Sequence, residues 1–161
     1  MINIKRCGKC QKTKSLNEFY KHKREKDGLE CWCKKCCYEY RKDWIKNNSI
    51  KYWCKRTIES HKERGHKVLF KKEDILPLAK LTKRCSICNI KLNWNLGNRN
   101  TPRLNSPTLD RKNNGNILEL KSIWIICRRC NQTKSNRNME ELYKWCETFV
   151  EKYKTLWARG L

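Results

Sequence analysis

The chain has 161 residues, a formal net charge of +23, twelve cysteines and a mean hydropathy of −0.97, which leaves little for a large hydrophobic core. The charge predicts a polyanionic partner, and we favour nucleic acid over an acidic membrane because no lipidation signal or strongly apolar helix face accompanies it. The longest apolar run, residues 123 to 127, is too short to span a bilayer, and no apolar leader follows Met1. We therefore expect a cytoplasmic protein. In that reducing compartment its cysteines should bind metal and not form disulfides.

The first 37 residues contain two cysteine pairs, each separated by two residues. This spacing aims both sulfurs of a pair at one tetrahedral ion, and thiolates favour zinc. The pattern predicts a zinc-ribbon or treble-clef-like module over residues 1–37, whose ligands are Cys7, Cys10, Cys33 and Cys36. Cys31 and Cys37 lie close enough to replace a member of the second pair. We favour Cys33 and Cys36 because they repeat the spacing of the first pair.

Residues 38–66 are predicted to form a basic helical connector. Apolar side chains recur at three- and four-residue steps between Ile50 and His61, with Ser49 suited to begin the helix and Gly65 to end it. The basic side chains mostly occupy other faces, among them Lys51, Lys55 and Arg56. This face is either a solvated surface of a linker or a surface laid along the phosphate backbone of DNA. We favour the second because aromatic residues are interleaved with the charges.

Residues 67–161 form the remaining segment, with a short strand over 68–70 and a helix that ends near Leu81. A second zinc site is predicted from two further pairs, Cys85, Cys88, Cys127 and Cys130. The asparagine-rich stretch 93–107 has the composition of a loop. Its Arg99 and Arg103 either contact DNA or belong to an irregular insertion.

Two strands are expected at 108–111 and 122–126, joined by the loop 112–119, and a short helix should begin around Cys130. Asn138 and Glu141 have the spacing of a capping box that opens a last helix. The apolar stripe of that helix is interpreted as core, and it consists of Leu142, Cys146, Phe149, Tyr153 and Leu156. We interpret Cys146, like Cys54, as a small buried hydrophobic residue.

The order strand, loop, strand, helix over residues 82–145 resembles the ββα-metal finger of the HNH endonucleases. The motifs that carry the resemblance are Cys85-Ser-Ile-Cys88, Ser106-Pro-Thr-Leu-Asp-Arg111 and Cys127-Arg-Arg-Cys-Asn-Gln-Thr-Lys134. The N-terminal module is similar to zinc modules fused to phage-encoded HNH proteins, which would place the protein in a host cytoplasm. We therefore expect a small α+β, zinc-stapled protein, with a ββα-metal finger and flanking helices in its C-terminal part.

The resemblance implies a DNA endonuclease or nickase that hydrolyses phosphodiester bonds in double-stranded DNA. Asp110 and Asn131 match the two protein ligands of the catalytic ion, Mg²⁺ or Mn²⁺, which would accompany two structural zinc ions. The alternative is that Asp110 caps the loop and Asn131 caps the helix. The basic residues near the start of that helix are expected to contact phosphates, and they are Arg128, Arg129 and Lys134.

The sequence departs from the best-known form of the family at two positions. Arg111 stands where the general-base histidine usually follows the aspartate, and Ser122 where an asparagine commonly fixes the loop. Arginine cannot accept a proton near neutral pH. The base is therefore another group or its work falls to the metal, and Arg111 is then a phosphate clamp or a surface charge. The three histidines, His22, His61 and His66, lie outside the finger. The competing hypotheses are a catalytically inactive, zinc-dependent DNA-binding protein on the HNH scaffold and a zinc-bridged adaptor.

Overall fold

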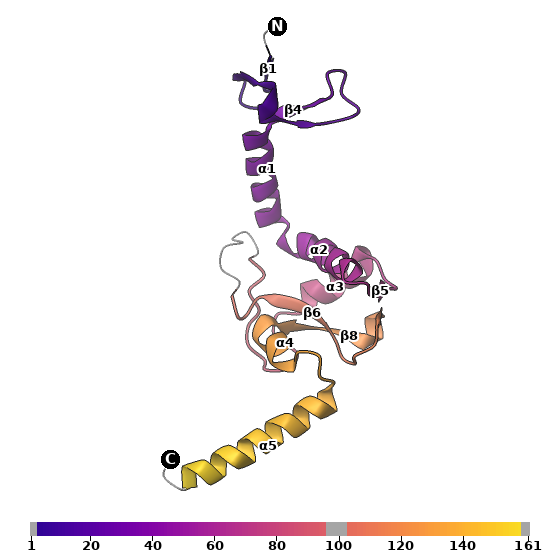
Figure 1. Ribbon diagram of the computed structural model, residues 1–161, viewed down its shortest axis with the longest axis vertical. Coiled ribbons are helices and arrows are strands. Elements are labelled where there is room, and N and C mark those ends of the chain that lie inside the picture. Colours follow the sequence, from indigo (N-terminus) through magenta and orange to yellow (C-terminus); the bar gives the residue numbers. More distant parts are fainter. Residues whose placement is uncertain (1–2, 96–102, 159–161) are drawn as a thin grey trace. The chain divides into compact units, whose positions relative to one another are not determined.

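The computed structural model describes residues 3–95 and 103–158 of the chain (Figure 1). Its contacts divide the chain into two compact units, Met1–Asn48 and Ser49–Leu161. The division falls inside the segment 38–66 that the sequence presented as one connector. Asn48 leaves the helical conformation, with φ −125° and ψ 35°, and so ends the last helix of the first unit.

The first unit is two small hairpins followed by a helix. Their elements are β1 (Ile4–Arg6) with β2 (Thr13–Ser15), the 3₁₀ turn η1 (Leu16–Glu18), β3 (Phe19–Lys21) with β4 (Leu29–Cys33), and α1 (Lys34–Asn47). The buried centre is Cys7, Phe19, Cys33 and Cys36, with Trp32 packed against it. A core composed mainly of cysteine side chains is too small to stabilise a fold of this size without bound metal.

The second unit packs helices against an antiparallel β-hairpin. Its elements are α2 (Ser49–Glu63), β5 (Lys67–Val68), α3 (Lys72–Leu81), β6 (Pro107–Arg111), β7 (Ile117–Leu118), η2 (Leu120–Ser122), β8 (Ile123–Cys127), α4 (Arg128–Lys134) and α5 (Met139–Ala158). β6 pairs with β8 so that Asp110 faces Trp124. The core includes Ile58 of α2, Ile75 of α3 and Ile125 of β8. The Trp53 indole joins α2 to the hairpin by donating to the carbonyl of Pro107 at 3.0 Å.

α2 is a core helix of this unit. The predicted apolar stripe is its buried face, including Trp53, Cys54 and Ile58, and Gly65 follows with φ +82°, a left-handed conformation that suits glycine. The basic residues are exposed, as expected, and they are Lys51, Lys55 and Arg56. The helix therefore presents its charges outward from a packed apolar face.

A short parallel ladder ties the loop of the β6–β8 hairpin to the segment after α2. Lys67 pairs with Ile117, and Val68 with Leu118. The sequence predicted a strand over 68–70 and an unbroken loop over 112–119, so both expectations need correction. Leu118 is fully buried, and the β5–β7 pairing gives hydrogen-bond partners to the backbone groups that are buried with it.

The final helix, α5, begins as predicted but does not pack as predicted. Asn138 and Glu141 form the capping box, with each side chain accepting from the other residue's backbone N–H, at 2.9 and 2.8 Å. Leu142 is buried, whereas Cys146, Phe149, Tyr153 and Leu156 are exposed. The interpretation of this stripe as core is therefore wrong: within this single chain, most of its residues are exposed. Among the described residues, no helix has the length and apolar composition that crossing a bilayer requires.

Candidate functional site

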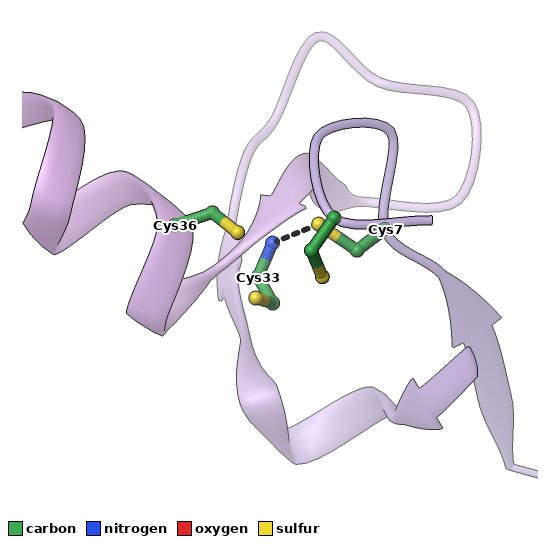
Figure 2. A group of neighbouring side chains, drawn as sticks. Cys7, Cys33 and Cys36 are labelled. Atoms are coloured by element: carbon green, nitrogen blue, oxygen red, sulfur yellow. Dashed lines mark hydrogen bonds between the residues drawn. The ribbon is translucent and has the colours of Figure 1, made fainter. Parts of the chain in front are cut away.

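The first cysteine group brings together four thiols from two places in the first unit. Cys7 and Cys10 come from the turn between β1 and β2, while Cys33 and Cys36 flank the start of α1, and the four sulfurs lie within 4.8 Å of one another. Figure 2 shows Cys7, Cys33 and Cys36 grouped together, with the backbone N–H of Cys33 donating to the Cys7 sulfur at 3.2 Å. The alternative ligands lie apart from this group: Cys31 is exposed, and the Cys37 thiol contacts the carbonyl of Trp32.

The second cysteine group is built in the same way. Cys85 and Cys88 lie in a turn, Cys127 and Cys130 flank the start of α4, and the backbone N–H of Cys127 donates to the Cys85 sulfur at 3.2 Å. Each turn also closes on a residue of positive φ, Gln11 in the first unit and Asn89 in the second, both at 59°. The chain thus uses one design twice, a cysteine turn followed by a hairpin and a helix.

Both groups fit a tetrahedral zinc ion. Zinc–sulfur bonds of about 2.3 Å place neighbouring sulfurs about 3.8 Å apart, and the sulfurs of Cys88 and Cys127 are separated by 3.7 Å. Burial by itself would raise the pKa of the Cys7 thiol, but N–H donors of Cys10, Cys33 and Lys9 lower it to about 6. In the second group the corresponding donors outweigh burial and lower the pKa of Cys85 to about 7. Each group therefore holds a thiol poised to bind metal as thiolate.

Asp110 lies at the end of β6 with both of its polar contacts on one carboxylate oxygen. Trp124 donates its indole N–H to Oδ2 at 2.7 Å, and the Lys134 ammonium lies 3.2 Å from the same atom. Asp110 and Lys134 are 8% and 2% exposed. Within the described residues, the hydrogen bond from Trp124 and the closest contact with Lys134 both involve Oδ2. The side chain is thus held through one oxygen.

Asn131 lies one turn before Lys134 on α4, which packs against β6 and β8. Residues three apart lie on the same side of a helix. Because Lys134 contacts Asp110, the side of α4 that carries Lys134 and Asn131 faces the end of β6. Lys134 itself is not placed as the sequence suggested. Its ammonium is buried on a carboxylate and not free to contact a phosphate.

Arg111 and Ser122, the two departures from the family pattern, both tie the loop between β6 and β8. Arg111 donates from Nη1 to the carbonyl of Gly115 at 2.8 Å. The Ser122 hydroxyl donates to the carbonyl of Glu119 and accepts from the backbone N–H of the same residue, both at 3.0 Å. The serine therefore fixes the loop itself, without an amide side chain.

Two histidines lie near the same strand end, on the side that α2 covers. His61 donates from Nε2 to the carbonyl of Leu109 at 3.3 Å, and its ring centroid is 5.5 Å from that of His66. Burial lowers the pKa of His61, and the Arg64, His66 and Arg111 charges lower it further, against a rise from the Leu109 carbonyl. Burial, Arg111 and Arg64 also lower the pKa of His66. Sequence spacing did not connect these rings to β6, although His61 belongs to the predicted apolar stripe of α2.

The other basic residues assigned to DNA have different environments. Arg103 and Arg129 are exposed, and Arg128 is half-buried. On α2, Lys55 and Arg56 each lie 3.7 Å from the Glu59 carboxylate, and Arg56 also pairs with Glu63 at 3.2 Å. Arg99 lies outside the described residues.

No protein-family model matches the chain, and no curated protein matches it. Among solved structures, the chain is similar to the rare-cutting HNH restriction endonuclease PacI, with 19% sequence identity and a TM-score of 0.41 over 97% of this chain and 98% of that one.

Proposed function

We propose that the protein is a divalent-metal-dependent DNA endonuclease or nickase of the HNH type. The observation that supports this most is the Asp110 carboxylate at the end of β6, within a β6–β8–α4 unit that the second cysteine group holds together. Trp124 and Lys134 fix Oδ2 of this carboxylate, which leaves Oδ1 for a hard cation.

Asp110 and the amide of Asn131 would hold Mg²⁺ or Mn²⁺, because carboxylate and amide oxygens suit hard cations. The bound ion would supply charge stabilisation at the scissile phosphate and at the departing 3′ oxygen. Trp124 and Lys134 orient the Asp110 carboxylate, and the two structural zinc ions would hold the hairpins and helices that carry these side chains.

DNA is the proposed polyanion, and its backbone would meet the exposed basic side chains. Arg103, Arg128 and Arg129 lie on segments close to the second cysteine group, and Lys51, Lys55 and Arg56 lie on the outer face of α2. These contacts would neutralise phosphates irrespective of base sequence. Binding should therefore weaken as salt concentration rises.

A plasmid assay tests the proposal. Zinc-loaded protein is incubated with supercoiled plasmid and Mg²⁺ or Mn²⁺, and nicked and linear products are measured for the wild type, Asp110→Asn and the control Asp43→Asn. Asp43 is an exposed carboxylate of α1 in the first unit, so its variant makes the same chemical change without altering a residue of the second unit. We expect cleavage by the wild type and the control, and its loss in Asp110→Asn with zinc content and DNA binding retained.

Two results would contradict this. Undiminished cleavage by Asp110→Asn would place the active site elsewhere. DNA binding without any cleavage by the wild type would identify the protein as a zinc-dependent DNA-binding protein on this scaffold.

A further inference from the structure

α5 exposes an apolar face that nothing else in the described part of the chain covers. Leu142 is buried at its start, but Phe149 and Trp157 are 61% and 71% exposed, and Tyr153 is exposed between them. An isolated helix is marginally stable in water, and most helices in proteins are stabilised by packing of their apolar face. We therefore expect the exposed apolar face of this 20-residue helix to pack against a partner.

The spacing of the apolar residues specifies a partner that is itself a helix. Four- and three-residue steps alternate along the whole stripe, which consists of Leu142, Cys146, Phe149, Tyr153 and Leu156. This alternation is the a and d pattern of a coiled coil, in which each side chain fits between side chains of a facing helix. We call this stripe the α5 seam, and it extends over about 21 Å at the rise of an α-helix.

The charges of α5 favour a second copy of the same helix in antiparallel orientation. Residues 139–148 contain three glutamates and one lysine, whereas residues 149–158 contain one glutamate and two lysines. An antiparallel pair sets the acidic half of each helix beside the basic half of the other, and it also aligns the helix dipoles favourably. A polyanion is a poor partner, because α5 carries net charge −1 within a chain of +23.

An apolar cavity at the base of α5 provides room for the far end of such a partner. Its volume is about 910 Å³, and it lies beside Leu142 and Cys146, the first two residues of the seam. Apolar side chains of the second unit form much of its wall, including Ile87, Ile90 and Leu104. In an antiparallel pair centred on Phe149, Leu142 faces the partner's Leu156, so the partner's Trp157 reaches this cavity.

From this geometry we propose that α5 is a homodimerisation helix, which pairs antiparallel with α5 of a second copy through the α5 seam and inserts Trp157 into the partner's cavity. The interface is isologous, because each copy contributes the same seam and the same cavity. The dimer would present two copies of the Asp110 site, but its formation does not depend on any activity at that site.

Sedimentation equilibrium of the zinc-loaded full chain in reducing buffer, without DNA, tests the pairing. Phe149→Glu places a charge at the centre of the seam, and Thr148→Glu places the same charge on the neighbouring exposed position outside it. We expect a wild-type dimer, an unchanged dimer for Thr148→Glu and at least about a hundredfold weaker association for Phe149→Glu, because burying an unpaired charge costs several kcal/mol. Zinc content confirms that each variant is folded. A monomeric wild type, or a Phe149→Glu variant that associates like the wild type, would overturn the proposal.

A cross-linking experiment tests the orientation. With Tyr153→Cys and oxidised glutathione, the antiparallel register predicts a disulfide between the introduced thiol and Cys146 of the second copy. Peptide mapping identifies the linked residues and separates this product from oxidation at the zinc ligands. A Cys146-to-Cys146 link in the wild type would indicate parallel helices and overturn the antiparallel arrangement.

Discussion

The Lys134 ammonium lies 3.2 Å from Oδ2 of Asp110, and both groups are buried. This ion pair joins the end of α4 to the end of β6, the two elements that carry the candidate ligands. A buried pair contributes little net stability when complete, but removal of one partner leaves an uncompensated charge. The pair therefore links the stability of the second unit to the geometry of its site.

Lys134→Met should destabilise the second unit by about 3 to 5 kcal/mol, because it leaves the Asp110 carboxylate without its counter-charge. Trp124→Phe removes the hydrogen bond to the same carboxylate, at a cost of about 1.5 to 3 kcal/mol, together with part of the aromatic packing against the core. Urea unfolding of the zinc-loaded chain measures both changes, and zinc content is the control. Equal losses of unfolding free energy in the two variants would show that the ion pair with Lys134 matters no more to stability than the contacts of Trp124.

Cys85→Ser should remove one zinc ion and unfold the second unit, because structural zinc contributes roughly 10 to 16 kcal/mol to the folding of small domains. Cys54→Ser is the matched control. Cys54 is buried and belongs to neither cysteine group, and burial raises the pKa of its thiol to about 11. Elemental analysis should give two zinc ions per chain for the wild type and for Cys54→Ser. Retention of two in Cys85→Ser would contradict the second site.

Local features of this fold could be predicted from sequence, whereas long-range contacts could not. The ligand pairs, the hairpin strands and the Asn138 capping box depend on spacings of a few residues, and the structure places them close to the predicted positions. The contact of Lys134 with Asp110 and that of His61 with Leu109 join residues 24 and 48 positions apart, and no local pattern encodes those distances. The exposure of the α5 seam could not be predicted for another reason: periodicity identifies an apolar face of a helix but does not show whether another element of the chain covers it.

The stability of the second unit should fall as the medium is acidified, because burial lowers the pKa of His61. In the unfolded chain a histidine titrates near about 6.5, so between that value and the lower folded pKa the unfolded state binds more protons. Stability from this group is thus complete above about pH 6.5 and is lost as pH falls through the folded pKa. His66 acts in the same direction through its own lowered pKa.

His61→Gln tests this pH dependence, because glutamine can still donate to the carbonyl of Leu109 but does not titrate. The free energy of unfolding, measured by urea at several pH values at which both zinc ions remain bound, should fall less steeply with acid in the variant. An unchanged slope would assign the pH dependence to other groups.

The most informative substitution at the strand end is Arg111→His, compared with Arg111→Gln. Both variants remove the guanidinium that donates to the carbonyl of Gly115, so both lose the same tie to the loop. Only the histidine adds a group that accepts a proton near neutral pH. If the missing base limits cleavage, the histidine variant should cut faster than the glutamine variant by a factor within the roughly 10² to 10⁴ that general-base catalysis supplies, with a rate that rises through about pH 6 to 7. Plasmid cleavage at saturating metal, with zinc content as the folding control, measures this ratio. A loss of activity that is equal in the two variants would instead support Arg111 as a phosphate clamp or loop tie, since an imidazole then contributes nothing that an amide does not.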